Sequence, residues 1–328
     1  MRREADGVAW FLESQGLQER AFERTLELRW TCLSGQEAIA VHLGGVIGVV
    51  CARMGGLGLP VVPGELTAVA GFGRPKPYAL DEAGLARLAS VLAGEAYAHV
   101  YVTLFTQPAR GRRQPFVSIG MGGSLRDRGV WSGYVRPAQA LGTFGIEGDP
   151  RLDEEAEAWS AMLVEICRRS GAAWGSVMLD YLCDLETTYE EYFGIGAEGE
   201  PQSGSHPRGY FWANVLSAGH VAGLGGRAVV QARCAELGLS VRPLGVGADS
   251  ALLLVRDPGP ICAFDDERLA AVRDLLDPIL IHHPYYWYAG PPLRLFKEPG
   301  TACLPVPDGL DPHLLVFDDD EPMTEDGQ

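Results

Sequence analysis

The chain has 328 residues, of which 47% are hydrophobic and 21% charged, and this composition excludes a chain that is disordered throughout. The formal net charge is −16 at pH 7 and the pI is about 4.8, so the chain repels nucleic acid phosphates and anionic lipid. The longest apolar run, Ala38–Ala52, is diluted by glycine, contains His42 and is shorter than a membrane span. The N-terminus lacks the apolar core of a secretory signal, so a cytoplasmic, reducing location is expected.

The first 140 residues are predicted to be rich in strands. Alternating polar and apolar residues, or short apolar runs, predict strands at 25–33, 66–72, 99–105, 116–121 and 130–135. Residues 80–92 form an amphipathic helical pattern, and residues 35–53 are a helical or mixed apolar stretch.

The second half begins with an acidic helix at 153–169 and a strand at 174–182. Residues 194–209 are rich in Gly, Ser and Pro and mark the best boundary between sub-domains. Beyond them the sequence predicts a strand at 210–216, a helix at 221–237, strands at 239–244 and 250–256, and a helix at 265–276. We therefore divide the chain into residues 1–200, residues 201–304, and an acidic, proline-containing, partly disordered tail at 305–328.

Several short patterns recur along the chain. Three predicted helices begin with an apolar residue and an acidic pair: Leu80-Asp81-Glu82, Leu152-Asp153-Glu154 and Phe264-Asp265-Asp266. The triplet Leu-Gly-Gly occurs twice, at Leu43-Gly44-Gly45 and at Leu224-Gly225-Gly226. Helix capping by acidic residues accounts for the first pattern, and an old duplication is the open alternative. The predicted fold is α+β, with antiparallel strands and helices packed mainly on one face. If the duplication is real, the fold consists of two similar strand–helix sub-domains.

The search for chemistry assigns no catalytic residue, cofactor or metal ligand. The sequence lacks GxSxG, a phosphate-binding loop and a complete dinucleotide fingerprint, and its seven cysteines form no CxxC pair. We therefore expect a protein that is not an enzyme. The alternative is an enzyme whose site is assembled from distant residues, around Asp180, His282 and His283.

The negative charge is concentrated in two segments. Residues 147–200 contain 14 acids and three arginines, and residues 308–328 contain eight acids and no Lys or Arg. Acids and aromatics mix within the first segment, a composition typical of a contact with a basic protein surface. The candidate partner-binding residues are Asp180, Asp184, Glu186, Tyr189, Glu190, Glu191 and Tyr192. The alternative is that the aromatics are core residues and the acids confer solubility.

Three stretches in a fixed order carry a family resemblance: Phe116–Gly123 (FVSIGMGG), Gly171–Val177 (GAAWGSV), and Arg208–Ser217 (RGYFWANVLS) followed by Leu224-Gly225-Gly226. This order resembles the immunity proteins of bacterial polymorphic toxin systems, the immunity protein 52 family first and the type VI immunity family next. The resemblance implies an α+β fold, no enzymatic activity, and a cognate toxin that is a nuclease of restriction-endonuclease type. The chain is longer than expected of that family, mainly in its loops and acidic tail.

The functional prediction is a cytoplasmic immunity protein that binds and neutralises a basic cognate toxin, with no nucleic acid or membrane partner. A structural or adaptor component of a phage or secretion assembly is the third alternative, beside the enzyme. The sequence predicts neither the oligomeric state nor the position of the interface.

Overall fold

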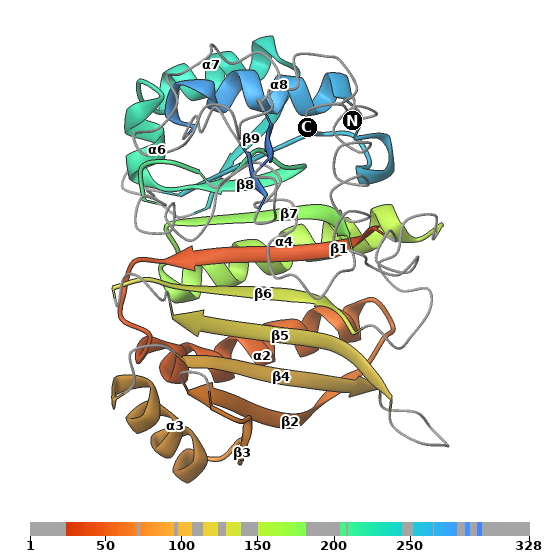
Figure 1. The fold of residues 1–328 in the computed structure, drawn as a ribbon. Helices are drawn as coiled ribbons and strands as arrows, with labels where there is room; N and C mark the ends of the chain where they lie inside the picture. Colours follow the sequence, from red (N-terminus) through yellow and green to blue (C-terminus); the bar gives the residue numbers. More distant parts are fainter. Residues whose placement is uncertain are drawn as a thin grey trace, which may run out of the picture.

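A ten-stranded antiparallel sheet runs through the protein in the order β3-β2-β4-β5-β6-β1-β7-β8-β10-β9 (Figure 1). The computed structural model describes residues 24–70, 73–94, 98–106, 114–123, 129–138, 150–181, 204–207, 209–244, 252–264, 266–280, 286–288 and 294–296. The tail at 305–328 lies outside these residues. The boundary predicted near residue 200 falls between β7 and β8, which pair with each other within the same sheet.

Although the many glycines and prolines predict short strands, six strands of the large sheet have seven to ten residues, and β3, β8, β9 and β10 have three or four. Those of the large sheet are β1 (Arg24–Cys32), β2 (Val61–Ala70), β3 (Lys76–Tyr78), β4 (Ala98–Thr106), β5 (Pro115–Gly123), β6 (Trp131–Pro137), β7 (Trp174–Tyr181), β8 (Ala213–Leu216), β9 (Ser240–Pro243) and β10 (Leu253–Arg256). A second, two-stranded sheet pairs β11 (Tyr286–Tyr288) with β12 (Arg294–Phe296).

The helices are divided between the two faces of the sheet. Helices α2 (Ala38–Gly56), α3 (Glu82–Gly94) and α4 (Leu152–Ser170) pack on one face and form the main core with the inward side chains of β1–β7. Helices α6 (Ala218–Gly223), α7 (Arg227–Glu236) and α8 (Asp266–Leu276) form a second core with Leu216, Leu253 and Val255. Their strand neighbours Val215 and Leu254 belong to the main core, so α6–α8 cover the opposite face of β8, β10 and β9.

The α+β class and the antiparallel sheet are therefore confirmed. The arrangement of helices mainly on one face holds for residues 24–181, and the last third of the sheet is covered from the other side. Two 3-10 helices, η3 (Ile261–Ala263) and η4 (Asp277–Ile279), flank α8.

By length and composition alone, α2 is the one helix among the described residues that could cross a membrane. The inner face of α2, including Leu43, Val50 and Met54, is part of the main core.

Three consecutive aromatics mark the place where the covered face changes. Tyr210 lies in the second core, Trp212 lies in the main core, and Phe211 packs with Trp174 and Met178 in a small third cluster. The side chain of Asn214 donates to the Phe211 carbonyl (2.6 Å) and accepts from the Phe211 N–H (3.1 Å). It thereby satisfies both buried backbone groups of a residue that precedes the β8 ladder.

One helix-to-strand junction occurs twice. The sequence Leu-Gly-Leu-x-Val-x-Pro follows α2 as residues 57–63 and α7 as residues 237–243. Gly58 and Gly238 both have left-handed backbones (φ 71° and 66°), and Leu59 and Leu239 donate to the carbonyls of Met54 and Cys234. Residues 43–45 and 224–226 are not equivalent, because the first lie inside α2 and the second form the turn between α6 and α7.

Both edges of the large sheet are blunted in the same way. The edge strands β3 and β9 are three and four residues long, and each contains a cation followed by proline: Lys76-Pro77 and Arg242-Pro243. Proline removes a ladder donor, and a charged side chain discourages pairing with another strand.

Glycines inside the sheet allow close packing, whereas those of α2 meet nothing. A Cβ on Gly133 would lie 2.3 Å from the indole ring of Trp30, while a Cβ on Gly48 would have no atom within 4 Å.

We predict that Gly133→Ala destabilises the protein by about 1–3 kcal/mol through overpacking. Gly48→Ala stabilises it by about 0.5–1 kcal/mol through helix propensity. Urea unfolding of both variants measures the difference, and equal shifts would contradict this packing.

Candidate functional site

The candidate partner-binding stretch begins at the end of a central strand. Asp180 is the penultimate residue of β7, where it pairs with Thr25 of β1. The other six residues, Asp184, Glu186, Tyr189, Glu190, Glu191 and Tyr192, lie outside the described residues. The structure thus fixes where this stretch starts.

The acids of α4 lie at the same end of the molecule. Gly171 ends α4 with a left-handed backbone (φ 64°), and residues 171–173 lead directly into β7. Since α4 packs against β7, the helix and the strand run antiparallel, and the first turn of α4 lies beside the last residues of β7 (Figure 1). Both described ends of the acidic segment 147–200 therefore converge at one end of the sheet, which we call the acidic end.

The carboxylates of α4 have different surroundings. Glu154 is exposed. Asp153 accepts a hydrogen bond from the Cys262 backbone N–H (3.2 Å), and Glu157 forms a 2.6 Å ion pair with Arg256 of β10. All three lie in the first two turns of α4, where the positive end of the helix dipole favours negative charge. The acidic end is therefore anchored to the body and also presents charge to solvent.

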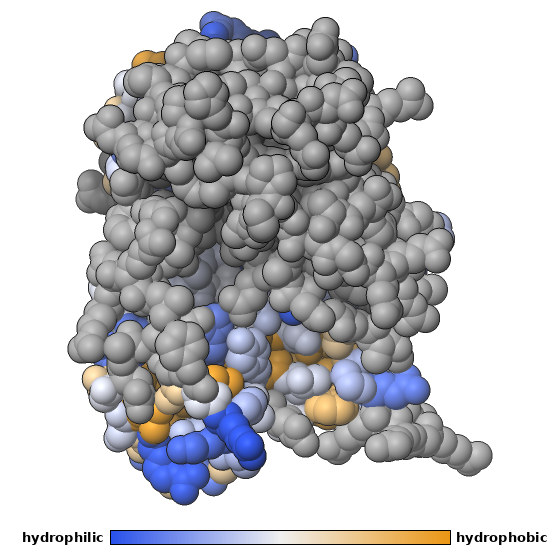
Figure 2. All heavy atoms as spheres, viewed as in Figure 1, coloured by the Kyte–Doolittle hydropathy of each residue, from blue (hydrophilic) through white to orange (hydrophobic). Residues whose placement is uncertain are grey.

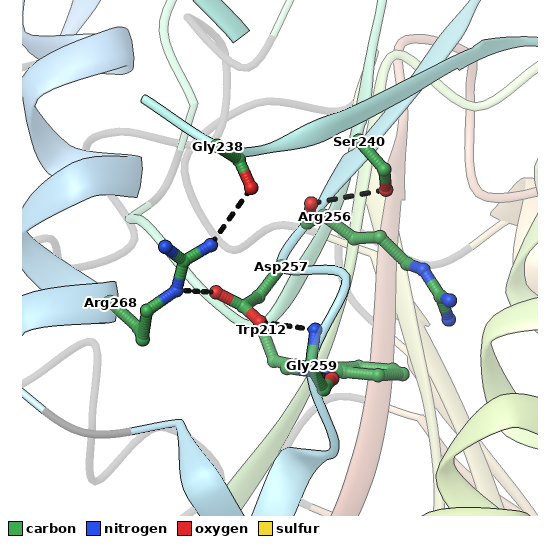
Figure 3. Close-up of polar contacts among 7 residues, drawn as sticks. All are labelled: Trp212, Gly238, Ser240, Arg256, Asp257, Gly259 and Arg268. Carbon is green, nitrogen blue, oxygen red and sulfur yellow. Dashed lines mark hydrogen bonds and ion pairs between the residues drawn. The ribbon is translucent and has the colours of Figure 1, made fainter. Parts of the chain in front are cut away.

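Two adjacent residues of opposite charge connect the helices on the two faces (Figure 3). Arg256 binds Glu157 of α4 and lies 5.0 Å from the centre of the Trp212 ring. Asp257 is buried and is ion-paired with Arg268 of α8. We call this arrangement the Arg256–Asp257 clamp, because it ties α4 on one face to α8 on the other.

The carboxylate of the clamp is well supplied with donors. Besides Arg268, it accepts from the Gly259 N–H (2.6 Å), and Arg268 also donates to the Gly238 carbonyl at the end of α7 (3.0 Å). The Trp212 indole donates to the Gly259 carbonyl (3.0 Å). Sequence reasoning missed this network, because its members lie up to 56 positions apart and no local pattern distinguishes them from ordinary surface charges.

A polar row runs along β1 on the face of the sheet opposite α2 and α4. Thr25, Glu27, Arg29 and Thr31 alternate with the core residues of this strand and are all buried. Arg29 donates to Glu27 at 2.5 Å, and the Thr31 hydroxyl lies 3.1 Å from that of Ser132. The charges of this row are mutually neutralised, as burial requires.

On the neighbouring strand β7, the Ser176 hydroxyl and the Trp174 indole N–H are buried and have no hydrogen-bond partner among the residues that the structure describes. Unsatisfied donors of this kind are rare in native structures. Their register partners are Arg29 and Thr31 of the polar row, so the orphaned donors belong to the same part of the sheet.

The described residues contain no group of three or more His, Cys, Asp or Glu placed to hold a metal ion. His282 and His283, considered with Asp180 for a non-local enzyme site, lie outside the described part of the chain. Burial raises the pKa of the Cys32 thiol to about 12, an effect only partly offset by a side-chain hydrogen bond with Ser170. Burial, together with nearby Cys32, raises the pKa of Cys167 well above its usual value. Neither thiol is therefore a nucleophile at neutral pH.

The stretches that carry the family resemblance fall on β5, on the turn into β7 with its first residues, on β8 with the residues before it, and on the turn between α6 and α7. Some of their glycines have packing roles. For example, a Cβ on Gly175 would lie 2.8 Å from Leu163 of α4. The resemblance therefore rests largely on residues of the sheet and of the turns beside it.

Comparison with known proteins gives a distant likeness to a solved structure. No protein-family model matches the sequence, and a search of curated proteins finds no match. Among solved structures, the chain is similar to a T6SS protein of Pseudomonas aeruginosa, with 10% sequence identity and a TM-score of 0.49. The alignment covers 79% of this chain and 74% of that protein.

The clamp predicts strong coupling between its two charges. We expect Asp257→Asn and Arg268→Met each to destabilise the protein by about 1–3 kcal/mol, because the partner group stays behind without its counter-charge. The double mutant should recover part of this loss. The exposed pair Arg233–Glu236 (3.1 Å) is the matched control, and Arg233→Met with Glu236→Gln should change stability by no more than about 0.5 kcal/mol. Denaturant unfolding of these four variants and the wild type tests this; additive effects at the clamp would contradict it.

Thiol burial predicts selective alkylation. Iodoacetamide at pH 8 should modify the exposed Cys262 in the native protein, while Cys32 and Cys167 react only after unfolding. The raised pKa of Cys32 also means that the folded state holds this proton more tightly. Its contribution to stability is complete below about pH 9, the usual thiol pKa, and declines as the pH rises toward about 12. Peptide mass mapping after alkylation reads out each site, and rapid native modification of Cys32 would contradict its burial.

Proposed function

We propose that this protein is an immunity protein that binds and neutralises a basic cognate toxin through its acidic end, without catalysis of its own. The observation that carries the proposal is the convergence of α4 and β7, which places the described parts of the 147–200 segment at one end of a large sheet. This segment has a formal charge of −11, counted from 14 acids and three arginines.

Charge complementarity supplies the physical mechanism. A patch with many carboxylates steers a basic partner during diffusion and raises the association rate, most strongly at low salt. The part of the patch formed by the first two turns of α4 is held by Arg256 and the Cys262 backbone, so it does not have to be ordered on binding. The aromatics Tyr189 and Tyr192 supply the apolar anchors that a slowly dissociating complex requires.

The test measures association of the full-length chain with the toxin encoded beside its gene, at 50 and 200 mM salt. Glu190→Lys with Glu191→Lys should slow association about tenfold and flatten its salt dependence. Glu154→Lys should act in the same direction with a smaller effect. Glu82→Lys is the matched control, because Glu82 is also an exposed acid in the first turn of a helix, in α3 far from the acidic end.

A second variant separates anchoring from steering. Tyr192→Ala should leave the association rate nearly unchanged and speed dissociation, at a loss of about 1–4 kcal/mol in binding free energy. Its melting temperature must be measured in parallel, because the competing interpretation makes this tyrosine a core residue. If the charge reversals change neither the association rate nor the salt slope, the acidic end is not the interface.

A further inference from the structure

One edge of the large sheet carries cations that lack a counter-charge. Arg74 precedes the edge strand β3, Lys76 lies in it and Arg87 lies in α3, and all three side chains are exposed. Among the residues that the structure describes, these three form no ion pair, whereas Arg169 and Arg256 lie 2.7 and 2.6 Å from a carboxylate. In a chain with 43 acidic and 27 basic residues, such a group stands out. We call these three cations, together with Tyr78, the cationic edge.

The register of β3 brings Lys76 and Tyr78 to the same side of the sheet. Lys76 pairs with Ala68 of β2 and Tyr78 pairs with Leu66, and both partners belong to the main core. Because paired residues share a face, Lys76 and Tyr78 lie on the side where α3 packs, about 7 Å apart along the strand. Arg87 of α3 lies over the Tyr78 ring, 5.8 Å from its centre. Two cations therefore lie beside one half-buried ring.

Two prolines hold this part of the chain extended. Arg74 precedes Pro75, and Lys76 precedes Pro77. A residue before proline is restricted to an extended backbone, and proline fixes its own φ angle. Pairing with β2 fixes the backbone from Lys76 onward as well. A backbone that is already set loses little freedom when a partner binds, so the cationic edge is preorganised while its long side chains can still adjust.

Protection of the sheet edge does not account for all three cations. The opposite edge strand, β9, has a single cation before proline, Arg242, which is exposed and forms no ion pair within the described part of the chain. On β3, Lys76 before Pro77 meets the same need. Arg74 and Arg87 lie outside the strand, so they add positive charge that protection of the edge does not require.

The acids nearest in sequence serve the start of α3. Asp81 accepts a hydrogen bond from the Gly84 N–H (2.7 Å), and Glu82 lies in the first turn, where the helix dipole favours negative charge. Figure 2 shows strongly hydrophilic side chains over α3 and β3, at the end of the molecule opposite α7 and α8. At physiological salt, charges more than about 8 Å away are largely screened, so a partner at this edge meets a local excess of cations.

The geometry points to the cationic edge as a binding surface for an acidic segment of another protein, one that carries several carboxylates beside an apolar or aromatic side chain. The guanidinium groups of Arg74 and Arg87 can each bind a carboxylate through two parallel hydrogen bonds, and Lys76 adds a point charge between them. The half-buried ring of Tyr78 supplies the apolar contact. The prolines leave few backbone donors, so the segment is held through side chains and not as an added strand.

The overall charge of −16 selects among anionic partners. A nucleic acid carries a phosphate at every nucleotide and would be repelled by the acidic remainder of the chain along its length. A short acidic segment needs only the surface of β3 and α3, where the local charge governs it. The inference does not rest on the proposed function, because the acidic end would bind a basic surface and the cationic edge an acidic segment.

The experiment selects displayed random 12-residue peptides on the immobilised full-length chain and measures binding of a labelled, selected peptide by fluorescence anisotropy. We expect enrichment of Asp or Glu next to apolar residues. The triple variant Arg74→Glu, Lys76→Glu, Arg87→Glu should weaken binding about tenfold or more, and the same three changes to Gln should weaken it less. Arg242→Glu is the matched control, because Arg242 is also an exposed cation before proline on an edge strand, and it should change binding less than about twofold.

Each other outcome overturns the inference. Recovery of only Lys- and Arg-rich peptides that bind the triple Glu variant equally would assign binding to the acidic end and leave the proposed function standing. Acidic peptides that bind this variant as well as the wild type, or no enrichment at all, would exclude the edge as a binding surface. A 20-nucleotide random RNA that displaces the peptide would assign the edge to nucleic acid, and self-association lost in the variant would assign it to a second copy. Equal melting temperatures show that folding is not the cause.

Discussion

The three aromatics Tyr210, Phe211 and Trp212 determine how the rest of the sheet can be covered. Each of these rings enters a different hydrophobic cluster. Tyr210 and Trp212 are two positions apart and yet lie in cores on opposite faces, so the chain departs here from the regular alternation of a strand. The sheet can therefore continue from β7 into β8 while its helical cover passes from one face to the other. Asn214 makes this possible, because it supplies the hydrogen bonds that Phe211 would otherwise lack in the interior. The Arg256–Asp257 clamp then connects α4 to α8 across the same region.

Covering a ten-stranded sheet in this way leaves particular surfaces for partners. The two edges end in short strands with Lys-Pro and Arg-Pro, so an additional strand from a partner would find few ladder groups and an adjacent cation. Recognition by strand addition is thereby disfavoured, and recognition through side chains remains. The acidic end, where α4 and β7 converge, is a surface that meets this requirement.

Much of the fold follows from local sequence, and the exceptions have physical causes. The strand predicted at 116–121 is β5, and the acidic helix predicted at 153–169 is α4, because alternation and amphipathic periodicity are local properties. The single helix predicted at 221–237 is two helices, since Gly225 and Gly226 have positive φ angles (87° and 98°) that break it. The division of helices between the two faces could not be predicted, because it depends on which cluster each aromatic enters. For the candidate site, the sequence indicated the acidic segment, whereas the clamp has no local signature.

The acidic end combines charge for attraction with a fixed place on the fold. Long-range attraction decides how often a basic partner arrives, and it depends on the many carboxylates of the 147–200 segment. Asp153 and Glu157 are held by the Cys262 backbone and by Arg256, and Asp180 belongs to a central strand. Because α4 packs against β7, these positions keep a constant spacing. A partner whose cations match that spacing gains short-range contacts that a merely cationic competitor lacks, so specificity would arise from geometry.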